Sequence, residues 1–404
     1  MLIGIVGKPS SGKSTFLNAA CLTNAKIGNY PFTTIDPNLG TGYLRVKCVC
    51  EELGVKDNPK NSQCLNHVRF IPIKLLDVAG LVPDAHLGKG LGNQFLSDLS
   101  KADALLHILD ISGETDSEGK EIVDGSHDPM DDIRFLEREI DLWFKDILLR
   151  KDWNRFANRV TMEKLNFVDL LYDRLSGLSI RKIHIIKAID RSKLNPEKPE
   201  KWTEADIERF SHELRQESKP FLIIANKIDK KHSEANYNRV KNELHDRIIP
   251  ASALAEFYLR KYAESGVIEY YPGDSSFKIV QNDKLKENEK KALSDIDEKI
   301  IKKYGSTGIQ MALQQAVFNL LNNIIVYPVY DEKKYTDKDG NVLPDAYIVP
   351  NEMAVKDFVN EKVHSDLAKN FIYAIDGRTK MRLGEGYKLK NNDIIKVVSA
   401  AKSK

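Results

Sequence analysis

The chain has 404 residues, which is long for a single hydrophobic core and favours two or three domains. Apolar residues make up 42% and charged residues 30% of the sequence, an ordinary globular composition, and the formal net charge is only +2. No apolar run approaches the roughly 20 residues that span a bilayer, and no cleavable signal precedes the first strand. We therefore expect a cytoplasmic protein that binds no membrane.

The first predicted element is a buried strand, because Met1 to Val6 is a short apolar run that ends in glycine. A helix is predicted from Lys13 to Ala20, and Gly7-x-x-x-x-Gly12-Lys13-Ser14 between the two matches the phosphate-loop pattern. Backbone N–H groups of such a loop and the following helix N-terminus attract phosphate. Lys13 is expected to reach the β- and γ-phosphates, and the Ser14 hydroxyl to bind Mg²⁺. The predicted nucleotide-binding residues of this loop are Gly7, Lys8, Pro9, Ser10, Ser11, Gly12, Lys13, Ser14 and Thr15.

The chain contains four cysteines, Cys21, Cys48, Cys50 and Cys64, which are too few and too unevenly spaced for a disulfide framework. Cys48-Val-Cys50 with Cys64 suggests zinc, but no second pair has ligand spacing. Alternation along a strand would place Cys48 and Cys50 on one face, where a free cysteine packs as a small hydrophobic residue. We predict this packing role.

Three more strands are predicted at Ile73–Val78, Ala104–Ile111 and Phe221–Ala225, with helix-compatible segments between them. This alternation predicts a mainly parallel sheet covered by helices on both faces, an α/β fold. Asp77-Val-Ala-Gly80 lies at the end of one strand. Asp77 is expected to hold Mg²⁺ through water, and the Gly80 N–H to sense the γ-phosphate.

The segment between Ile111 and Pro220 has helical rather than strand periodicity. Apolar residues recur at steps of three and four from Ile133 to Ile147 and again from Leu165 to Leu175, and Thr203-Glu-Ala-Asp206 is typical of a helix start. This predicts a helical insertion, either an arm for partners or a packed accessory domain. The acidic stretch Asp110–Gly119 lacks the spacing of a calcium loop, so we predict a solvated loop.

Asn226-Lys-Ile-Asp229 follows the strand that ends at Ala225. One carboxylate can accept hydrogen bonds from both N1 and N2 of guanine, whereas adenine lacks that pair of donors, so Asp229 is expected to select guanine. The Lys227 stem can cover the base, and Asn226 can connect the surrounding loops. Ser252 and Ala253 are expected to offer a backbone N–H to the guanine O6.

The last part of the chain predicts a small separate domain of about 80 residues. Phe371–Ile375 and Ile394–Val398 are predicted strands, and Ala354–Val363 a helix. From Phe371 to Lys404 there are eight basic and three acidic residues, a balance of +5. This end of the chain could bind a polyanion such as RNA or could carry only solvated surface charge.

These motifs in this order resemble the Obg-related GTPases, most closely the YchF/Ola-type branch and its archaeal and fungal relatives. The similarity includes Asn29–Thr34, the glycine-rich segment Gly80–Asn93, Gly305–Gly308 and Asn351–Ala400. It implies a Ras-like P-loop GTPase domain with an inserted α-helical domain and a C-terminal β-grasp (TGS) domain. The implied boundaries are 1–127 and 213–322 for the GTPase domain, 128–212 for the insertion and 323–404 for TGS.

The resemblance also implies roles for residues in the switch segments. Thr34, with Thr33 as the neighbouring alternative, aligns with the threonine that closes on Mg²⁺ when the γ-phosphate is bound. Leu81 stands where Ras-type enzymes carry the glutamine that orients the attacking water, so hydrolysis by the Ras arrangement is excluded. His86 matches a histidine of the family pattern and could position the water. Ser10 replaces an asparagine that is associated with a stimulating potassium ion, which leaves potassium dependence open.

We thus expect a monomeric switch that binds GTP and GDP, hydrolyses GTP slowly with Mg²⁺, and acts with the ribosome or RNA in translation or stress control. Its helical and TGS domains are the expected contact regions. An ATP-hydrolysing switch and a nucleotide sensor with negligible turnover remain alternatives. A metabolic kinase is disfavoured, because it would not need the guanine motif.

Overall fold

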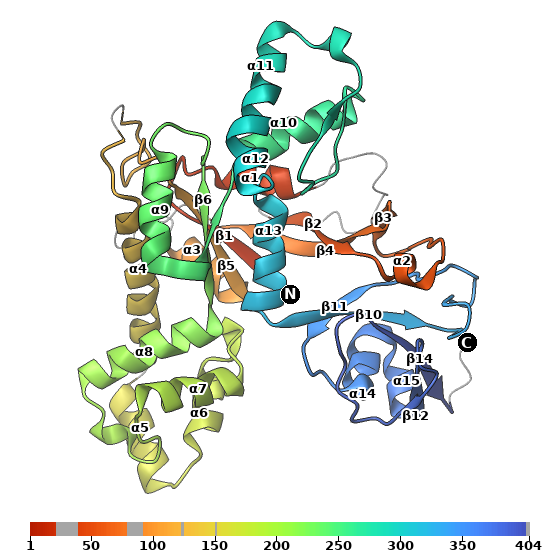
Figure 1. Cartoon of the computed structure of the whole chain (residues 1–404). Coiled ribbons are helices and arrows are strands. Elements are labelled where there is room, and N and C mark those ends of the chain that lie inside the picture. The colour runs from red at the N-terminus through yellow and green to blue at the C-terminus, as the bar shows by residue number, and fades with distance from the viewer. Residues whose placement is uncertain (22–38, 79–91, 123–124, 150–151, 401–404) are drawn as a thin grey trace. The chain divides into compact units, whose positions relative to one another are not determined.

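The structure is a computed structural model that describes residues 1–21, 39–78, 92–122, 125–149 and 152–400 (Figure 1). The chain divides into two compact units. The first comprises Met1–Cys21, Ile35–Gly40 and Lys74–Ala312, and the second Leu22–Thr34, Thr41–Ile73 and Leu313–Lys404. Within the described ranges, no helix combines the length and the apolar composition that a membrane crossing requires.

The first unit is built on a parallel sheet, which confirms the predicted α/β fold. Its strands follow the order β4-β1-β5-β6-β7, and every neighbouring pair is parallel. The strand bounds are Leu2–Val6 for β1, Val68–Asp77 for β4, Ala104–Asp110 for β5, Phe221–Asn226 for β6 and Ile248–Pro250 for β7. Strands β5 and β6 are buried along their whole length, as expected for a sheet covered on both faces.

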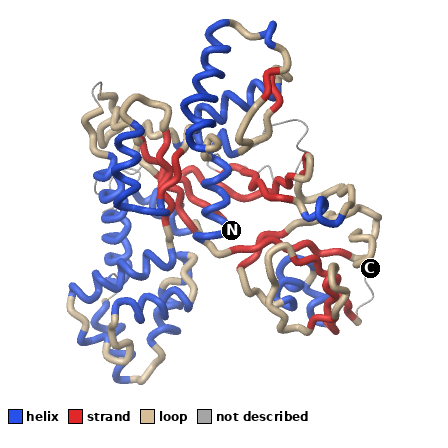
Figure 2. The backbone as a smooth tube through the Cα atoms, in the orientation of Figure 1, coloured by secondary structure: helices blue, strands red, loops and turns tan. Residues whose placement is uncertain are grey.

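Helices lie on both sides of this sheet, with α4 (Pro129–Leu149) and α9 (Ser233–Leu244) on one side and α1 (Lys13–Ala20) on the other (Figure 1 and Figure 2). The pair β8 and β9, at Ile268–Glu269 and Lys278–Ile279, is antiparallel. Helix α11 continues into a π-helical segment, Asp297–Ile301. The helices of this unit outside the insertion are α1 (Lys13–Ala20), α3 (Gly92–Lys101), α9 (Ser233–Leu244), α10 (Ala253–Glu264), α11 (Glu287–Ile296) and α12 (Lys302–Tyr304), while α13 (Ile309–Gln314) runs to the boundary with the second unit.

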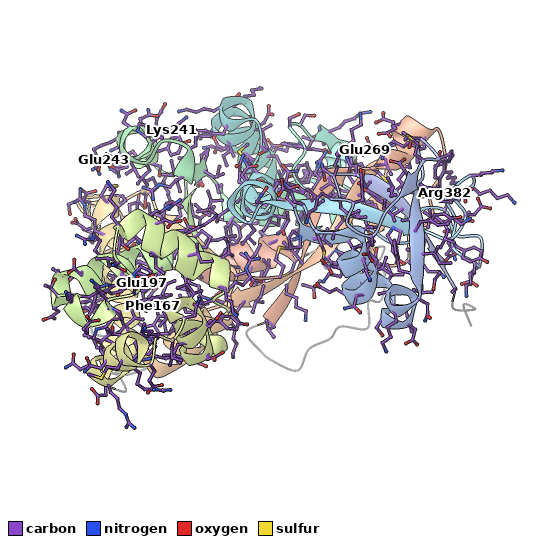
Figure 3. All side chains as sticks on the ribbon, turned by 90° about the horizontal axis from the view of Figure 1, so that it is seen from below. Phe167, Glu197, Lys241, Glu243, Glu269 and Arg382 are labelled. Atoms are coloured by element: carbon purple, nitrogen blue, oxygen red, sulfur yellow. The ribbon has the colours of Figure 1, made fainter. Side chains whose placement is uncertain are left out.

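The predicted insertion is helical. It contains α4 (Pro129–Leu149), α5 (Trp153–Met162), α6 (Phe167–Arg174), α7 (Lys182–Ser192) and α8 (Glu204–Ser218). Its core includes a group of aromatic rings around Phe167, which Figure 3 labels among these helices. The Phe167 ring lies 5.2 Å from Trp202 and 6.1 Å from Phe210, measured between centroids. Such aromatic pairs stabilise a core beyond their buried area.

The start of α8 carries the predicted cap. The Thr203 hydroxyl accepts a hydrogen bond from the Asp206 N–H at 3.2 Å, and the Asp206 carboxylate accepts one from the Thr203 N–H at 2.9 Å. We expect Thr203→Ala to lower the free energy of unfolding by about 1 kcal/mol, because an orphaned helix N–H loses its acceptor. Denaturant unfolding measures this effect. Thr203→Ser keeps the hydroxyl and should stay within a few tenths of wild type; an equal loss in both variants would contradict the capping role.

The second unit contains a five-stranded mixed sheet in the order β11-β10-β14-β12-β13. Strands β10 and β14 are parallel, and the other neighbours are antiparallel. The predicted strands near 371–375 and 394–398 are confirmed, and the predicted helix 354–363 is α14 followed by a π-helical turn. The bounds are β10 Asn323–Val329, β11 Tyr347–Pro350, α14 Val355–Phe358, the turn Val359–Val363, α15 Ser365–Lys369, β12 Phe371–Asp376, β13 Arg382–Leu383 and β14 Asp393–Ser399.

The second unit also contains residues 41–73, where one prediction is wrong. Strand β2 (Leu39–Lys47) ends before Cys48, and Cys50 lies in the short helix α2 (Val49–Leu53). The two cysteines therefore do not share the face of a strand. Strand β3 (Gln63–Leu65) contains Cys64 and pairs antiparallel with β4. Apolar alternation cannot reveal this helix, because five residues are too few to show helical periodicity.

Candidate functional site

The phosphate loop joins β1 to α1 at the carboxyl end of the parallel strands. Gly7 and Gly12 have φ values of 149° and 97°, which only glycine adopts without strain. A Cβ on Gly12 would lie 2.3 Å from Asn226 Nδ2. Lys13 Nζ donates hydrogen bonds to the carbonyls of Gly7 and Lys8, both at 2.9 Å, so its ammonium lies across the loop. Burial lowers the Lys13 pKa, and the charge of Asp77 opposes this shift.

Ser14 and Asp77 come together beside this loop. Strand β4 runs parallel to β1 with Asp77 opposite Ile5, which brings the aspartate to the same edge of the sheet as the loop. The Ser14 hydroxyl donates a hydrogen bond to Asp77 Oδ2 at 3.2 Å. A hydroxyl and a carboxylate are oxygen ligands of the type that Mg²⁺ prefers, so Ser14 and Asp77, two of the three residues predicted for the ion, fit it chemically.

Asn226 is the last residue of β6, and its side chain connects two loops. Its side-chain Nδ2 donates to the Ser11 carbonyl at 2.9 Å, and its Oδ1 accepts from the Ala253 N–H at 3.0 Å. The residue is 3% exposed. Because both ends of a buried amide are hydrogen-bonded, Asn226 fixes the phosphate loop against the segment at Ser252 and Ala253.

Lys227 lies over a buried carboxylate that the sequence analysis did not select. Its Nζ pairs with Asp110 Oδ2 at 2.7 Å, and Asp110 is fully buried. Burial alone would raise the Asp110 pKa, but hydrogen bonds from Lys227, Ser112 and Thr115 lower it overall. The predicted solvated loop at Asp110–Gly119 is therefore wrong for its first half, where the side chains of Asp110, Ser112 and Thr115 form a buried hydrogen-bonded network. The sequence signal that could have indicated this network is the position of Asp110 at the end of a buried strand.

Asp229 lies at the Ser252 hydroxyl, which donates to Asp229 Oδ1 at 2.7 Å. The Ser252 N–H donates to the Thr307 carbonyl at 2.9 Å, and the Ala253 N–H is used by Asn226. Gly305–Gly308, which resembled part of the TGS domain, therefore belongs beside the guanine motif. A Cβ on Gly308 would lie 2.0 Å from the Pro250 carbonyl oxygen, which explains the glycine.

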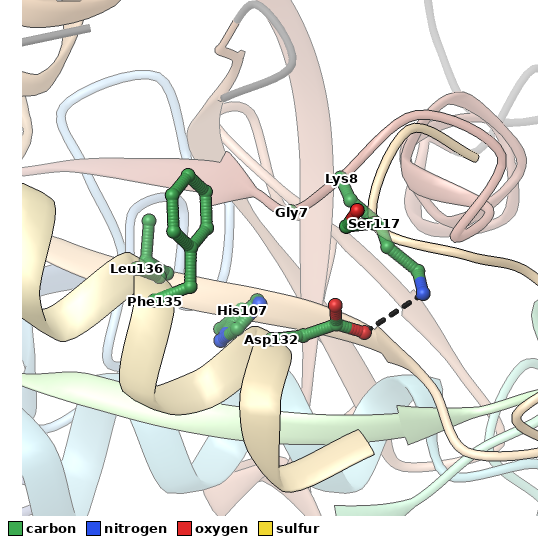
Figure 4. A pocket seen from close by; sticks show the side chains of 7 residues that line it. All are labelled: Gly7, Lys8, His107, Ser117, Asp132, Phe135 and Leu136. Atoms are coloured by element: carbon green, nitrogen blue, oxygen red, sulfur yellow. Dashed lines mark ion pairs between the residues drawn. The ribbon is translucent and has the colours of Figure 1, made fainter. Parts of the chain in front are cut away.

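Lys8 turns its side chain away from the loop and into the protein. Lys8 Nζ pairs with Asp132 Oδ2 of α4 at 2.9 Å and donates to the Thr115 carbonyl at 2.7 Å. Figure 4 shows this ion pair at a small pocket lined by Gly7, Lys8, His107, Ser117, Asp132, Phe135 and Leu136. The first insertion helix is thus joined to the phosphate loop by a buried ion pair, and only the backbone of Lys8 faces the predicted phosphate position.

His107 lies in the same pocket and is 2% exposed. Burial first, then the charges of Lys13 and Lys8, lower its pKa to about 3 from an ordinary 6.5. The folded protein therefore excludes the proton that an unfolded chain takes up below pH 6.5, so stability falls as the pH drops from 6.5 towards 3.

We expect His107→Gln to reduce this acid sensitivity. Each excluded proton changes the free energy of unfolding by up to about 1.4 kcal/mol per pH unit, so the wild-type curve should fall more steeply between about pH 6 and 4 than the variant curve. Urea unfolding across this pH range gives both curves. His245→Gln changes an exposed histidine and should leave the slope unchanged. Parallel curves for wild type and His107→Gln would contradict the proton exclusion.

Several predicted residues lie outside the described part of the chain: Thr33, Thr34, Gly80, Leu81 and His86. The other predicted site residues are described and lie close together: the phosphate loop, Asp77, Asn226–Asp229 and Ser252–Ala253. Four residues outside the motifs, not predicted from the sequence, form hydrogen bonds or ion pairs in and around this site: Asp110, Thr115, Asp132 and Thr307.

Comparison with known proteins gives three family matches. The 50S ribosome-binding GTPase family matches residues 2–136, the G4 motif-containing domain of Obg-like GTPases similar to YGR210 matches 224–331, and the TGS domain matches 333–399. The last match confirms the predicted C-terminal TGS domain.

Relatives match over almost the whole chain. GTP-binding protein MJ1332 of Methanocaldococcus jannaschii is 48% identical over 99% of this chain and 100% of its own. GTP-binding protein C428.15 of Schizosaccharomyces pombe is 37% identical over 98% of this chain and 95% of its own. The crystal structure of a GTP-binding protein from Pyrococcus horikoshii has 39% identity and a TM-score of 0.79, covering 99% of this chain and 100% of that one. The chain belongs to the Obg-related P-loop GTPases, in one family with the GTP-binding proteins MJ1332 and C428.15.

Proposed function

We propose that this protein is a Mg²⁺-dependent molecular switch that hydrolyses GTP slowly to GDP and phosphate. The observation that carries the proposal is the position of Asn226, whose amide bonds to Ser11 of the phosphate loop and to Ala253 beside the guanine motif. A single buried side chain thereby couples the residues proposed for phosphate with those proposed for the base. Asp229 would accept from guanine N1 and N2, and Lys227 would cover the ring.

The proposed Mg²⁺ ligands are Ser14, Thr34 and, through water, Asp77. The ion would neutralise charge on the β- and γ-phosphate oxygens. Lys13 adds a second positive charge over the loop, and its partial burial strengthens the interaction with phosphate. The loop N–H groups from Gly7 to Thr15 would supply the remaining donors.

In the proposed reaction a water oxygen bonds to the γ-phosphorus, and the bond from that phosphorus to the bridging β,γ-oxygen breaks. GDP and inorganic phosphate leave. The Leu81 side chain has no polar atom that could orient the water, so turnover without a partner is slow. We propose His86 as the positioning group, with Thr34 and the Gly80 N–H sensing the γ-phosphate.

Phosphate release after mixing the full chain with GTP tests the reaction. We expect slow release of one phosphate per GTP consumed, which continues over many turnovers with excess GTP and stops when Mg²⁺ is omitted from the buffer. If GTP binds but no phosphate is released above the uncatalysed background, the protein is a nucleotide sensor and not a hydrolysing switch. Release without Mg²⁺ would contradict the metal dependence.

We further propose that the switch acts as a cytoplasmic monomer on the ribosome or its RNA. The match of residues 2–136 to a family described as 50S ribosome-binding supports this partner, as do the exposed lysines Lys388 and Lys390 of the basic C-terminal segment.

Co-sedimentation with ribosomes in the presence of a non-hydrolysable GTP analogue tests whether the protein binds the ribosome. We expect binding that weakens with salt and with the double variant Lys388→Glu and Lys390→Glu. Lys284→Glu changes an exposed lysine outside that segment and is the matched control. If the wild-type protein stays in the supernatant at low salt with the GTP analogue, the ribosomal role is wrong.

A further inference from the structure

Three cysteines and an aspartate form a compact cluster in the second unit. Cys48 precedes helix α2, Cys50 lies in it, Asp57 follows it, and Cys64 lies in β3. One ligand atom from each of these four residues lies within 4.8 Å of the other three. Cys48 and Cys50 are each 1% exposed, and all the cysteines are free thiols. Residues that are spread from position 48 to position 64 thus direct four metal-ligating atoms to one point.

Two spacings within the cluster are close to those of tetrahedral coordination. Cys50 Sγ and Cys64 Sγ are 3.8 Å apart, and Cys48 Sγ is 3.2 Å from Asp57 Oδ2. Zinc lies about 2.3 Å from thiolate sulfur and about 2.0–2.2 Å from carboxylate oxygen, so two tetrahedral sulfur ligands are about 3.8 Å apart. The sulfur pair already has this separation, and the sulfur and oxygen pair would open by a few tenths of an ångström.

The surrounding residues fit a site that carries negative charge. Three thiolates and one carboxylate around Zn²⁺ leave a net charge of −2. Arg69 is fully buried beside them, with Nη1 3.1 Å from Asp57 Oδ2 and 4.0 Å from Cys48 Sγ. Such outer groups orient ligands and balance charge. The same guanidinium donates to the Leu343 carbonyl at 2.8 Å, which links the cluster to the C-terminal part of this unit.

A tight turn brings the last ligand into place. Asn66 and His67, between β3 and β4, have φ values of 48° and 64°, as in a two-residue hairpin turn. The Cys48 N–H donates to the His67 carbonyl at 2.8 Å, and His67 Nδ1 lies 3.2 Å from Cys50 Sγ. The histidine ring therefore contacts one sulfur from outside the group of four.

We propose that Cys48, Cys50, Asp57 and Cys64 bind one structural zinc ion, with His67 and Arg69 as outer partners. Soft thiolate ligands favour zinc over magnesium or calcium, and four protein ligands leave no open position for catalysis. The ion would fix α2 and the loop after it against β3. The spacing C-x-C-x6-D-x6-C lacks the usual second cysteine pair, which explains why the sequence did not predict it.

Metal content of the full chain tests the site directly. The protein is purified without chelators, and zinc is measured by mass spectrometry of the digested sample; Co²⁺ is then exchanged in. We expect one zinc per chain, and for the cobalt form the intense visible bands of tetrahedral Co²⁺ with near-ultraviolet thiolate charge transfer. A wild-type chain that binds neither metal, or that forms a Cys50–Cys64 disulfide under the same conditions, would overturn the proposal.

Variants then assign the ligands. Cys48→Ser and Cys64→Ser should weaken zinc binding about 100-fold or more, because each removes one of four ligands. Cys21→Ser changes the one cysteine outside the cluster and should retain the metal. Asp57→Asn should weaken zinc binding while the thiolate charge-transfer bands persist. His67→Gln changes an outer partner and should weaken zinc binding less than Asp57→Asn does. Zinc retained in Asp57→Asn and lost in His67→Gln would show that this ligand set is wrong.

Discussion

Lys13→Met is expected to weaken GTP binding by about 100-fold and to abolish measurable phosphate release. Hydrogen bonds to charged groups contribute about 1.5–3 kcal/mol each, and Lys13 is the ammonium that lies across the phosphate loop. Titration of the protein with GTP measures the loss of affinity, and phosphate release measures the loss of turnover. Methionine keeps the length of the apolar stem, so the fold should persist.

The control for this variant is Lys303→Met, which changes an exposed lysine of the same unit that pairs with Glu234. It should bind and hydrolyse GTP as wild type does. Unchanged GTP affinity in Lys13→Met would mean that the loop does not hold the phosphates.

Asp229→Asn is expected to weaken GTP binding by about 100-fold or more, because the amide cannot accept two hydrogen bonds from guanine and one of its own donors would face the base. The introduced amide can instead donate to a carbonyl oxygen at the purine C2 position. Xanthosine triphosphate has such an oxygen, and the variant should bind it better than wild type does. Competition titrations with GTP and xanthosine triphosphate measure the ratio of the two affinities in the variant and in wild type.

Asp246→Asn, at an exposed aspartate after α9, is the matched control and should leave both affinities unchanged. A uniform loss for both nucleotides in Asp229→Asn would indicate a misfolded loop. Equal binding of GTP by the variant and wild type would exclude Asp229 from guanine recognition.

The parts of the fold that the sequence predicted are those with local patterns. The phosphate loop, the apolar strands and the helix start at Thr203 depend on neighbouring residues. All of them appear in the structure near the expected positions, although β4 begins at Val68, five residues before the predicted strand. Motif order then indicated which loops should meet, because the carboxyl ends of parallel strands share one edge of the sheet.

The unpredicted features depend on contacts between distant residues. Lys8 pairs with Asp132, and Lys227 with Asp110, across more than a hundred positions of chain. No periodicity connects such residues. The grouping of Cys48, Cys50 and Cys64 was missed for a related reason. Strand β2 ends at Lys47 and α2 begins at Val49, so the expected strand through Cys48 and Cys50 does not form. The turn at Asn66 and His67 then returns the chain to Cys48.

Binding of GTP and ATP to the unaltered chain, measured side by side by calorimetry with Mg²⁺ present, tests the proposed guanine switch most directly. Asp229 and its partner Ser252 predict that GTP binds about 100-fold more tightly than ATP or better, because adenine leaves the carboxylate without its two donors. Equal affinity for the two nucleotides, or tighter binding of ATP, would contradict guanine selection and favour an ATP-dependent switch.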